Sequence, residues 1–118
     1  MNYKDLKIWQ KGFHLALCIY TLTKNFPPRE KFGIIDQMRR CAVSIPSNIA
    51  EGAGRKANKD FSRFCSIAQG SCNELETQLL LAQELKYITP EQTIEIREAI
   101  VEISKMINSF QKKLTTNN

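Results

Sequence analysis

The sequence predicts an all-α protein, folded as an antiparallel up-down-up-down four-helix bundle. Four segments of its 118 residues carry apolar side chains three and four positions apart, a spacing that places them on one face of a helix. The breaks between these segments are short and contain proline, glycine or asparagine, and short connections make successive helices antiparallel. No stretch shows the two-residue alternation of a strand. Residues 1–118 are therefore expected to form a single four-helix-bundle domain.

The first helix is expected from Leu6 to about Lys24, with Asp5 as its N-cap and the Pro27-Pro28 pair ending it. Gly12 marks a point where a second helix comes close, because glycine otherwise weakens a helix. Two neighbouring apolar rows give this helix a wide buried face. They are Leu6, Trp9, Phe13, Ala16, Tyr20 and Thr23 in one row, and Ile8, Leu15, Ile19 and Leu22 in the other.

The second helix is expected to start near residues 29–32 and to continue to about Ala53, with Gly52 and Gly54 forming its exit. Pro46 lies in its middle, where it removes a backbone hydrogen bond and costs about 3 kcal/mol or more. Packing on neighbouring helices must therefore hold this segment together. Its apolar stripe consists of Ile34, Met38, Cys41, Ala42, Ile45 and Ile49.

The third helix is expected from about Lys59 to Lys86, with Asn58 as its N-cap. The fourth begins at Thr89-Pro90, where Gln92 completes a capping box. The two seams are Phe61, Cys65, Ala68, Cys72, Leu75, Leu79 and Ala82 in the third helix, and Ile96, Ile100, Ile103, Ile107, Phe110 and Leu114 in the fourth.

Reaction centres are hard to find in this sequence. The four cysteines form no CxxC pair and are expected to be small buried thiols, and the single histidine, His14, is expected to be packed or at the surface. Neither a Glu-x-x-His pair nor a glycine-rich phosphate loop occurs. We therefore expect no catalytic residue, no metal and no cofactor. No apolar run approaches the roughly 18 residues of a membrane span, and the polar N-terminal stretch does not resemble a secretory signal, so a cytoplasmic protein is expected.

Positive charge is unevenly placed along the chain. The formal net charge is +5, with +6 in residues 1–58 and −1 in residues 59–118. A basic surface of this kind can contact the phosphates of RNA or DNA. The predicted contact residues are Arg55, Lys56, Lys59 and Arg63 around the second connection, with Arg39, Lys7 and Lys11 as secondary candidates.

A row of polar residues follows the edge of the second and third helices. Since it contains no group that titrates naturally near pH 7, a structural network is favoured over an active site. Arg40 could pair with Glu74, and the side chains beside Pro46 could satisfy the backbone groups that it frees. The proposed network consists of Gln37, Arg40, Ser44, Asn48, Glu51, Ser71 and Glu74.

Several motifs, in order over nearly the whole chain, resemble a known family. They are Asp5-Leu6-Lys7-Ile8-Trp9-Gln10, Phe26-Pro27, Gln37-x-x-Arg40, Ser44-Ile45-Pro46-Ser47-Asn48-Ile49-Ala50-Glu51-Gly52 and Gly70-Ser71-x-x-Glu74-Leu75. Together they are similar to the four-helix-bundle proteins encoded within intervening sequences of bacterial 23S rRNA genes. The resemblance implies a bacterial source, assembly as a ring-like homopentamer, and kinship to the accessory variability determinant of diversity-generating retroelements. That relative is a basic barrel that associates with a reverse transcriptase and nucleic acid.

These observations lead to one hypothesis and one alternative. The hypothesis is a non-enzymatic, oligomeric accessory protein whose basic surface binds RNA or DNA through backbone contacts, with binding that weakens as salt rises. The alternative is a protein-interaction scaffold, or an accessory subunit for a partner such as a polymerase, in which the basic surface meets acidic protein without direct nucleic-acid binding. Several helices are apolar over more than one stripe, which also favours self-association.

Overall fold

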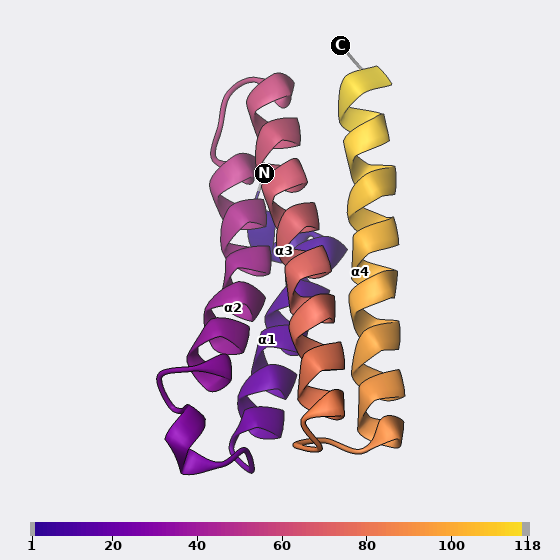
Figure 1. Ribbon diagram of the computed structural model, residues 1–118. Coiled ribbons are helices and arrows are strands. Elements are labelled where there is room, and N and C mark those ends of the chain that lie inside the picture. The colour runs from indigo at the N-terminus through magenta and orange to yellow at the C-terminus, as the bar shows by residue number, and fades with distance from the viewer. Residues whose placement is uncertain (1, 117–118) are drawn as a thin grey trace.

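Four helices, each antiparallel to the one before it, make up the fold of the computed structural model, which describes residues 2–116 (Figure 1). They are α1 (Lys7–Thr23), α2 (Ile34–Ala53), α3 (Asn58–Glu84) and α4 (Pro90–Thr116), with short 3-10 helices η1 (Tyr3–Asp5) and η2 (Pro28–Glu30). The bundle measures 47 × 23 × 20 Å along its principal axes. The predicted all-α up-down bundle is therefore confirmed.

Three of the four predicted helix starts differ from the structure. Asp5 ends η1, and Leu6 precedes α1 without any side-chain cap hydrogen bond. Ala57, which has no capping side chain, takes the N-cap position expected for Asn58. The second helix begins only at Ile34, because the residues expected to start it form η2 and a turn. At these three helix starts, backbone turns lead into the helix where polar side-chain caps were expected.

The start of α4 is the one that follows the sequence prediction in detail. The backbone N–H of Gln92 donates to Oγ1 of Thr89 at 3.1 Å, and the N–H of Thr89 donates to Oε1 of Gln92 at 2.9 Å. Both bonds of a capping box are thus present. They satisfy N–H groups that a helix N-terminus otherwise leaves unpaired.

The core follows the predicted seams of α2, α3 and α4, whereas only part of the wide face predicted for α1 is buried. Ile8, Leu15 and Ile19 of one predicted row are buried. In the other row Ala16 and Thr23 are buried, while Phe13 and Tyr20 are 48% and 41% exposed. Gly12 lies at a close contact with α2, because a Cβ there would be only 3.3 Å from Cγ2 of Ile45 and 3.5 Å from the Pro46 ring. The side of α1 that carries Gly12 therefore faces α2, as the sequence suggested for a close helix contact.

The α2–α3 pair packs most extensively and the α1–α4 pair least. Since α1 has 17 residues and α3 and α4 have 27 each, α1 covers only part of their length. The α2–α3 connection and the last turns of α4 lie at one end of the bundle, and the other two connections lie at the opposite end (Figure 1). Among the described residues, no helix is both long and apolar enough to cross a membrane.

All four helices contact their neighbours at one height along the long axis of the bundle. The helices meet there through backbone proximity, hydroxyl and amide hydrogen bonds and an ion pair. This level divides the molecule into two halves along its long axis. The contacts are Gly12 with Ile45, Ser44 with Ser71, Gln69 with Ser104 and Lys11 with Glu102.

Candidate nucleic-acid interface

The connection between α2 and α3 is held tightly against α3. A Cβ on Gly52 would lie 2.7 Å from Cδ1 of Phe61 and 2.9 Å from Cβ of Phe64, so only glycine allows this approach. The N–H of Arg55 then donates to the carbonyl of Gly52 at 3.0 Å, which orders the backbone at the start of the connection. The basic residues that follow therefore start from an ordered backbone.

Two predicted contact residues lie against one aromatic ring. The guanidinium carbons of Arg55 and Arg63 are 4.8 and 4.6 Å from the ring centroid of Phe64. Arg55 also lies 3.9 Å from the carboxylate of Glu51. Stacking on a buried ring limits the freedom of each guanidinium without using its hydrogen-bond donors. Both arginines thus keep donors available for phosphate oxygens, and the exposed side chains of Lys56 and Lys59 lie in the same short segment.

The last turns of α4 add lysines that the sequence reasoning missed. The amide of Gln111 donates to the Ser62 carbonyl at 2.9 Å and to Oγ of Ser66 at 2.8 Å, which joins the end of α4 to the start of α3. Lys112 and Lys113, both exposed, follow directly. About fifty residues separate them from the predicted cluster, so only the fold brings the two segments to the same end.

A second group of cations faces the gap between α1 and α4. Lys7, a secondary candidate, lines a cleft of about 370 Å³ together with Lys105 and Lys113. Lys105 was also missed, because α1 and α4 lie at opposite ends of the sequence. The cleft therefore extends the basic surface from the α2–α3 connection toward the start of α1.

The other two secondary candidates are engaged by neighbouring groups. Lys11 forms an ion pair with Glu102 at 2.9 Å. Arg39 donates to Oγ1 of Thr23 at 2.9 Å and to the Tyr20 carbonyl at 3.3 Å, and it lies 4.6 Å from the centroid of the Tyr20 ring. The structure thus places Arg39 in the opposite half of the bundle, away from the main cluster.

Charge separates along the long axis of the bundle. The half that contains the α2–α3 connection, here called the basic half, comprises residues 2–12, 45–70 and 103–116 and has ten Lys and Arg against three Asp and Glu, a net +7. The remaining half, residues 13–44 and 71–102, has seven against nine, a net −2. The segregation is thus a spatial property of the fold and not only a property of the N-terminal sequence.

Part of the predicted polar network forms beside Pro46. The hydroxyls of Ser44 and Ser71 lie 2.5 Å apart, and Oγ of Ser44 is 2.7 Å from the Cys41 carbonyl. The Asn48 amide donates to the Ser44 carbonyl at 2.7 Å. Because one hydroxyl has one proton, Ser44 donates to the Cys41 carbonyl and accepts from Ser71. The bond between Ser44 and Ser71 joins α2 to α3, and the other two bonds provide side-chain donors to the Cys41 and Ser44 carbonyls. Neither is the Ala42 carbonyl that Pro46 leaves without its helical N–H.

The other members of that network lie elsewhere. Arg40 donates to Asp36 at 2.9 Å on its own helix, so the suggested pairing with Glu74 is replaced by a local ion pair. Gln37 and Glu74 are exposed, as is Glu51, which pairs with the arginine that follows α2. The predicted set is therefore divided between one interhelical contact and several surface positions.

The Cys41 thiol, which lies beside this network, is not activated as a nucleophile. Cys41 donates to the Ser71 carbonyl at 3.1 Å. Burial, followed by the nearby negative charge of Glu74 and by Cys72, raises the pKa of the Cys41 thiol to about 12. A protonated thiol is a poor nucleophile. The group around Ser44 and Ser71 therefore has the character of a structural contact.

The chain matches the model of the 23S rRNA-intervening sequence protein family over residues 4–109. It belongs to that family. A solved structure that resembles this family member is that of a protein with unknown function from the S23 ribosomal protein family of Bacteroides thetaiotaomicron. The two chains are 30% identical with a TM-score of 0.80, and the match covers 89% of this chain and 98% of the other. No curated protein matches this chain.

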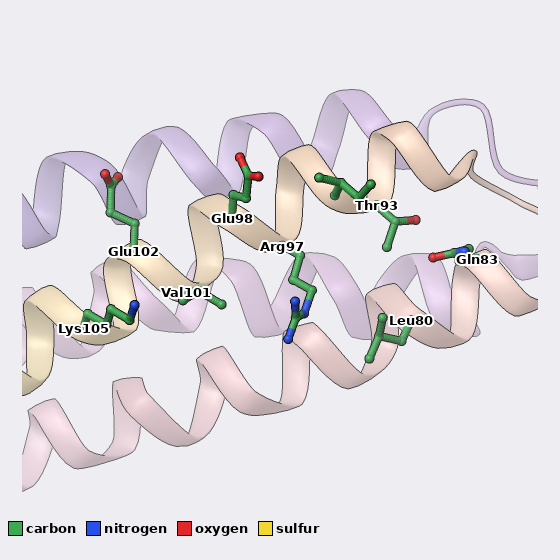
Figure 2. Close-up of a pocket in the computed structure, with 9 residues that line it drawn as sticks. Leu80, Gln83, Thr93, Arg97, Glu98, Val101, Glu102 and Lys105 are labelled. Carbon is green, nitrogen blue, oxygen red and sulfur yellow. The ribbon is translucent and has the colours of Figure 1, made fainter.

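This family member also has a large open groove along α3 and α4, of about 770 Å³ (Figure 2). Leu80 and Gln83 reach it from α3, and Arg97 extends from α4 toward α3, where it pairs with Glu76 at 2.6 Å. Glu102, at the other end, is the partner of Lys11. Within residues 2–116, no group of three or more His, Cys, Asp or Glu side chains is placed to hold a metal ion. The groove combines apolar side chains with charged ones, of which Arg97 and Glu102 are held in ion pairs.

Proposed function

We propose that this protein is a non-enzymatic, oligomeric accessory protein whose basic half binds the phosphate backbone of RNA or DNA. The observation that carries the proposal is the separation of a +7 half from a −2 half. Concentrated positive charge attracts polyanions and steers their approach. Few aromatic side chains accompany the exposed cations, so the binding does not depend on base sequence.

The geometry of the arginines supports the same proposal. Arg55 and Arg63 stack on Phe64, which lowers the entropy lost when a guanidinium binds phosphate. Lys56 and Lys59 add exposed point charges nearby. Phosphate contacts made by such side chains position a protein on nucleic acid without reading its sequence.

Self-association is part of the proposal. Phe13, Leu17 and Tyr20 are between 41% and 54% exposed on one side of α1, together with Val43 of α2. A contiguous apolar surface of this kind is typical of a protein–protein contact. A ring-like homopentamer, which the family resemblance implies, would repeat the basic half around an axis and add the fields of its copies.

The test is a fluorescence-anisotropy titration of the protein against short RNA and DNA at 50 and 200 mM salt, with its mass measured by light scattering in the same buffers. Affinity is expected to fall steeply between the two salt concentrations, because binding releases counterions. A variant with Arg55, Lys56, Lys59 and Arg63 changed to Gln should bind about a hundredfold or more weakly at 50 mM. Its matched control changes four cations of the opposite half to Gln: Lys24, Arg29, Lys31 and Lys86.

Two results would reject the proposal. Equal losses in the two variants would mean that total charge, not the basic half, governs binding. No binding at 50 mM by an intact oligomer would favour the scaffold alternative, in which the basic half meets an acidic protein. A monomeric mass would reject the ring-like oligomer. The two variants would still decide whether the basic half binds nucleic acid.

A further inference from the structure

One of the four thiols differs from the others. Cys41, Cys65 and Cys72 are buried, whereas Cys18 is only partly covered, so the prediction of four buried thiols fails at this position. Sγ of Cys18 lies 3.6 Å from Nε2 of His14, one turn earlier on α1. With the ring proton placed on Nδ1, Nε2 faces the thiol as an acceptor. The exposed imidazole can therefore take the thiol proton.

His14 and Cys18 both line a cleft of about 510 Å³ between α1 and α4. This volume is within the roughly 300–1,000 Å³ typical of small-molecule sites. Four charged side chains line the cleft: Lys7 and Lys11 from α1, and Glu95 and Glu102 from α4. Lys11 and Glu102 pair with each other, which leaves Lys7 and Glu95 as the cation and the anion that a ligand could meet.

The rest of the cleft is apolar. Leu15 lies on the α1 side, and Ile96, Ala99 and Ile103 lie on the α4 side. An apolar floor with opposite charges along its edge suits a small molecule that carries both a carboxylate and an ammonium group. Because the thiol and imidazole line the same cleft, such a molecule would be held beside a potential nucleophile.

We propose that Cys18 is a site of reversible S-thiolation by a small zwitterionic disulfide of the amino-acid or peptide class, with His14 as the proton acceptor. The Cys18 sulfur attacks one sulfur of the disulfide while Nε2 of His14 takes the thiol proton. A new S–S bond forms, the original S–S bond breaks, and its electron pair leaves on the departing thiolate. That thiolate then takes a proton from the imidazolium, so the protein thiol is oxidised and half of the disulfide is reduced.

Oxidised glutathione is the probe for this site. The folded protein is incubated with it, and adducts are located by intact-mass and peptide mass spectrometry. One adduct per chain is expected, on Cys18, and Cys18→Ser should remove it, while urea-unfolded protein should react at all four cysteines. Absence of an adduct on Cys18, or comparable labelling of Cys41, Cys65 or Cys72 in the folded protein, would overturn the proposal.

The roles of His14 and of the cleft have separate readouts. His14→Gln should slow labelling of the folded protein about tenfold without changing the rate in urea, since the imidazole acts only when the helix holds it beside the thiol. The folded protein should prefer oxidised glutathione over the neutral bis(2-hydroxyethyl) disulfide by more than the unfolded protein does. Lys7→Gln should reduce that preference, and Lys24→Gln, outside the cleft, should not. An unchanged rate in His14→Gln, or equal preferences in folded and unfolded protein, would contradict the assignment.

Discussion

The two halves of the bundle are built on the same apolar seams but differ in their acids more than in their cations. The basic half has ten Lys and Arg and the other half has seven, whereas the numbers of Asp and Glu are three and nine. Core periodicity therefore sets how the helices pack, and it leaves the exposed faces free to carry different charges at the two ends. The small number of acids at one end leaves a net positive surface there without any change to the packing.

The halves also differ in how their helices begin. In the half with a net charge of −2, α4 starts with the Thr89–Gln92 capping box. In the basic half, α3 starts at Ala57 without a side-chain cap, directly beside the closely packed glycine of α2. Order near the cations thus depends on backbone approach and ring stacking, whereas at the opposite end α4 has a side-chain capping box and α2, which follows Gly33, has no side-chain cap.

The largest expected effect comes from blocking the close approach in the basic half. Gly52→Ala would place a methyl group against Phe61 and Phe64 and should lower the free energy of unfolding by about 2–3 kcal/mol. Gly70→Ala is the matched control, because no neighbouring atom lies within 4 Å of its added Cβ and helix propensity should raise stability by up to about 1 kcal/mol. Urea denaturation measures both, and a loss in Gly70→Ala as large as in Gly52→Ala would contradict the contact.

Alkaline pH should destabilise the fold through a buried thiol in each half, and Cys41, whose pKa is raised further, adds to the loss in the half that is not basic. Burial raises the pKa of Cys65, in the basic half, and of Cys72, in the other, from an ordinary 9.0 to about 11. Above pH 9 the unfolded chain loses these protons while the folded chain keeps them, so the free energy of unfolding falls as pH rises to about 11. Below pH 9 the two thiols add no pH dependence. The loss should be on the order of 1–2 kcal/mol per thiol at pH 11.

Denaturation at pH 7, 9 and 11 checks this prediction in Cys65→Ala and Cys72→Ala. Each variant should lose less stability above pH 9 than the original chain. If Cys72→Ala flattened the alkaline loss and Cys65→Ala did not, local charge and not burial would be its cause.

Helix capping should produce a change of about 1 kcal/mol, with opposite signs at the two ends. Thr89→Ala removes the box at the start of α4 and should lower the melting temperature. Ala57→Ser supplies a hydroxyl to the uncapped start of α3, without altering the charge of the basic half, and should raise it. A calorimetric scan of each variant decides the matter, and a destabilised Ala57→Ser would show that the tight connection does not admit the cap.

The smallest expected effect concerns the arginines themselves. Changing both Arg55 and Arg63 to Lys keeps every charge but loses planar stacking on Phe64, and affinity for RNA or DNA should weaken about threefold. Lys56→Arg, which leaves the ring contacts intact, is the control in the same anisotropy titration. An affinity unchanged by the double substitution would assign the surface to charge alone.

Most of the fold could be predicted from the sequence, because the patterns that determine it are periodic and involve residues close together in the chain. The seams of α2, α3 and α4 and the capping box at Thr89 each depend on residues a few positions apart. The orientation of α1 could not be predicted from such local patterns. Its two apolar rows are adjacent and each is only partly buried, and the side of α1 that faces α2 is marked by contact of Gly12 with Ile45 and Pro46, more than thirty residues away.

The candidate interface was predictable to the same limited extent. Arg55 and Arg63 are close in sequence, so their clustering was visible, although their shared contact with Phe64 was not. Lys105 and Lys113 join Lys7 only because α4 returns beside α1. Arg39 lies apart from the main cluster, and its bonds to α1 could not be predicted from the sequence.

The limited packing between α1 and α4 has a consequence for the order of folding. Contact between these helices joins the two ends of the chain, so its formation closes the longest loop and loses the most chain entropy. The α2–α3 hairpin, with its short connection and extensive packing, can form first and serve as a template for the outer helices. Amide hydrogens along α1 should therefore exchange with solvent before those in the middle of α3, through an opening that exposes the cleft around Cys18.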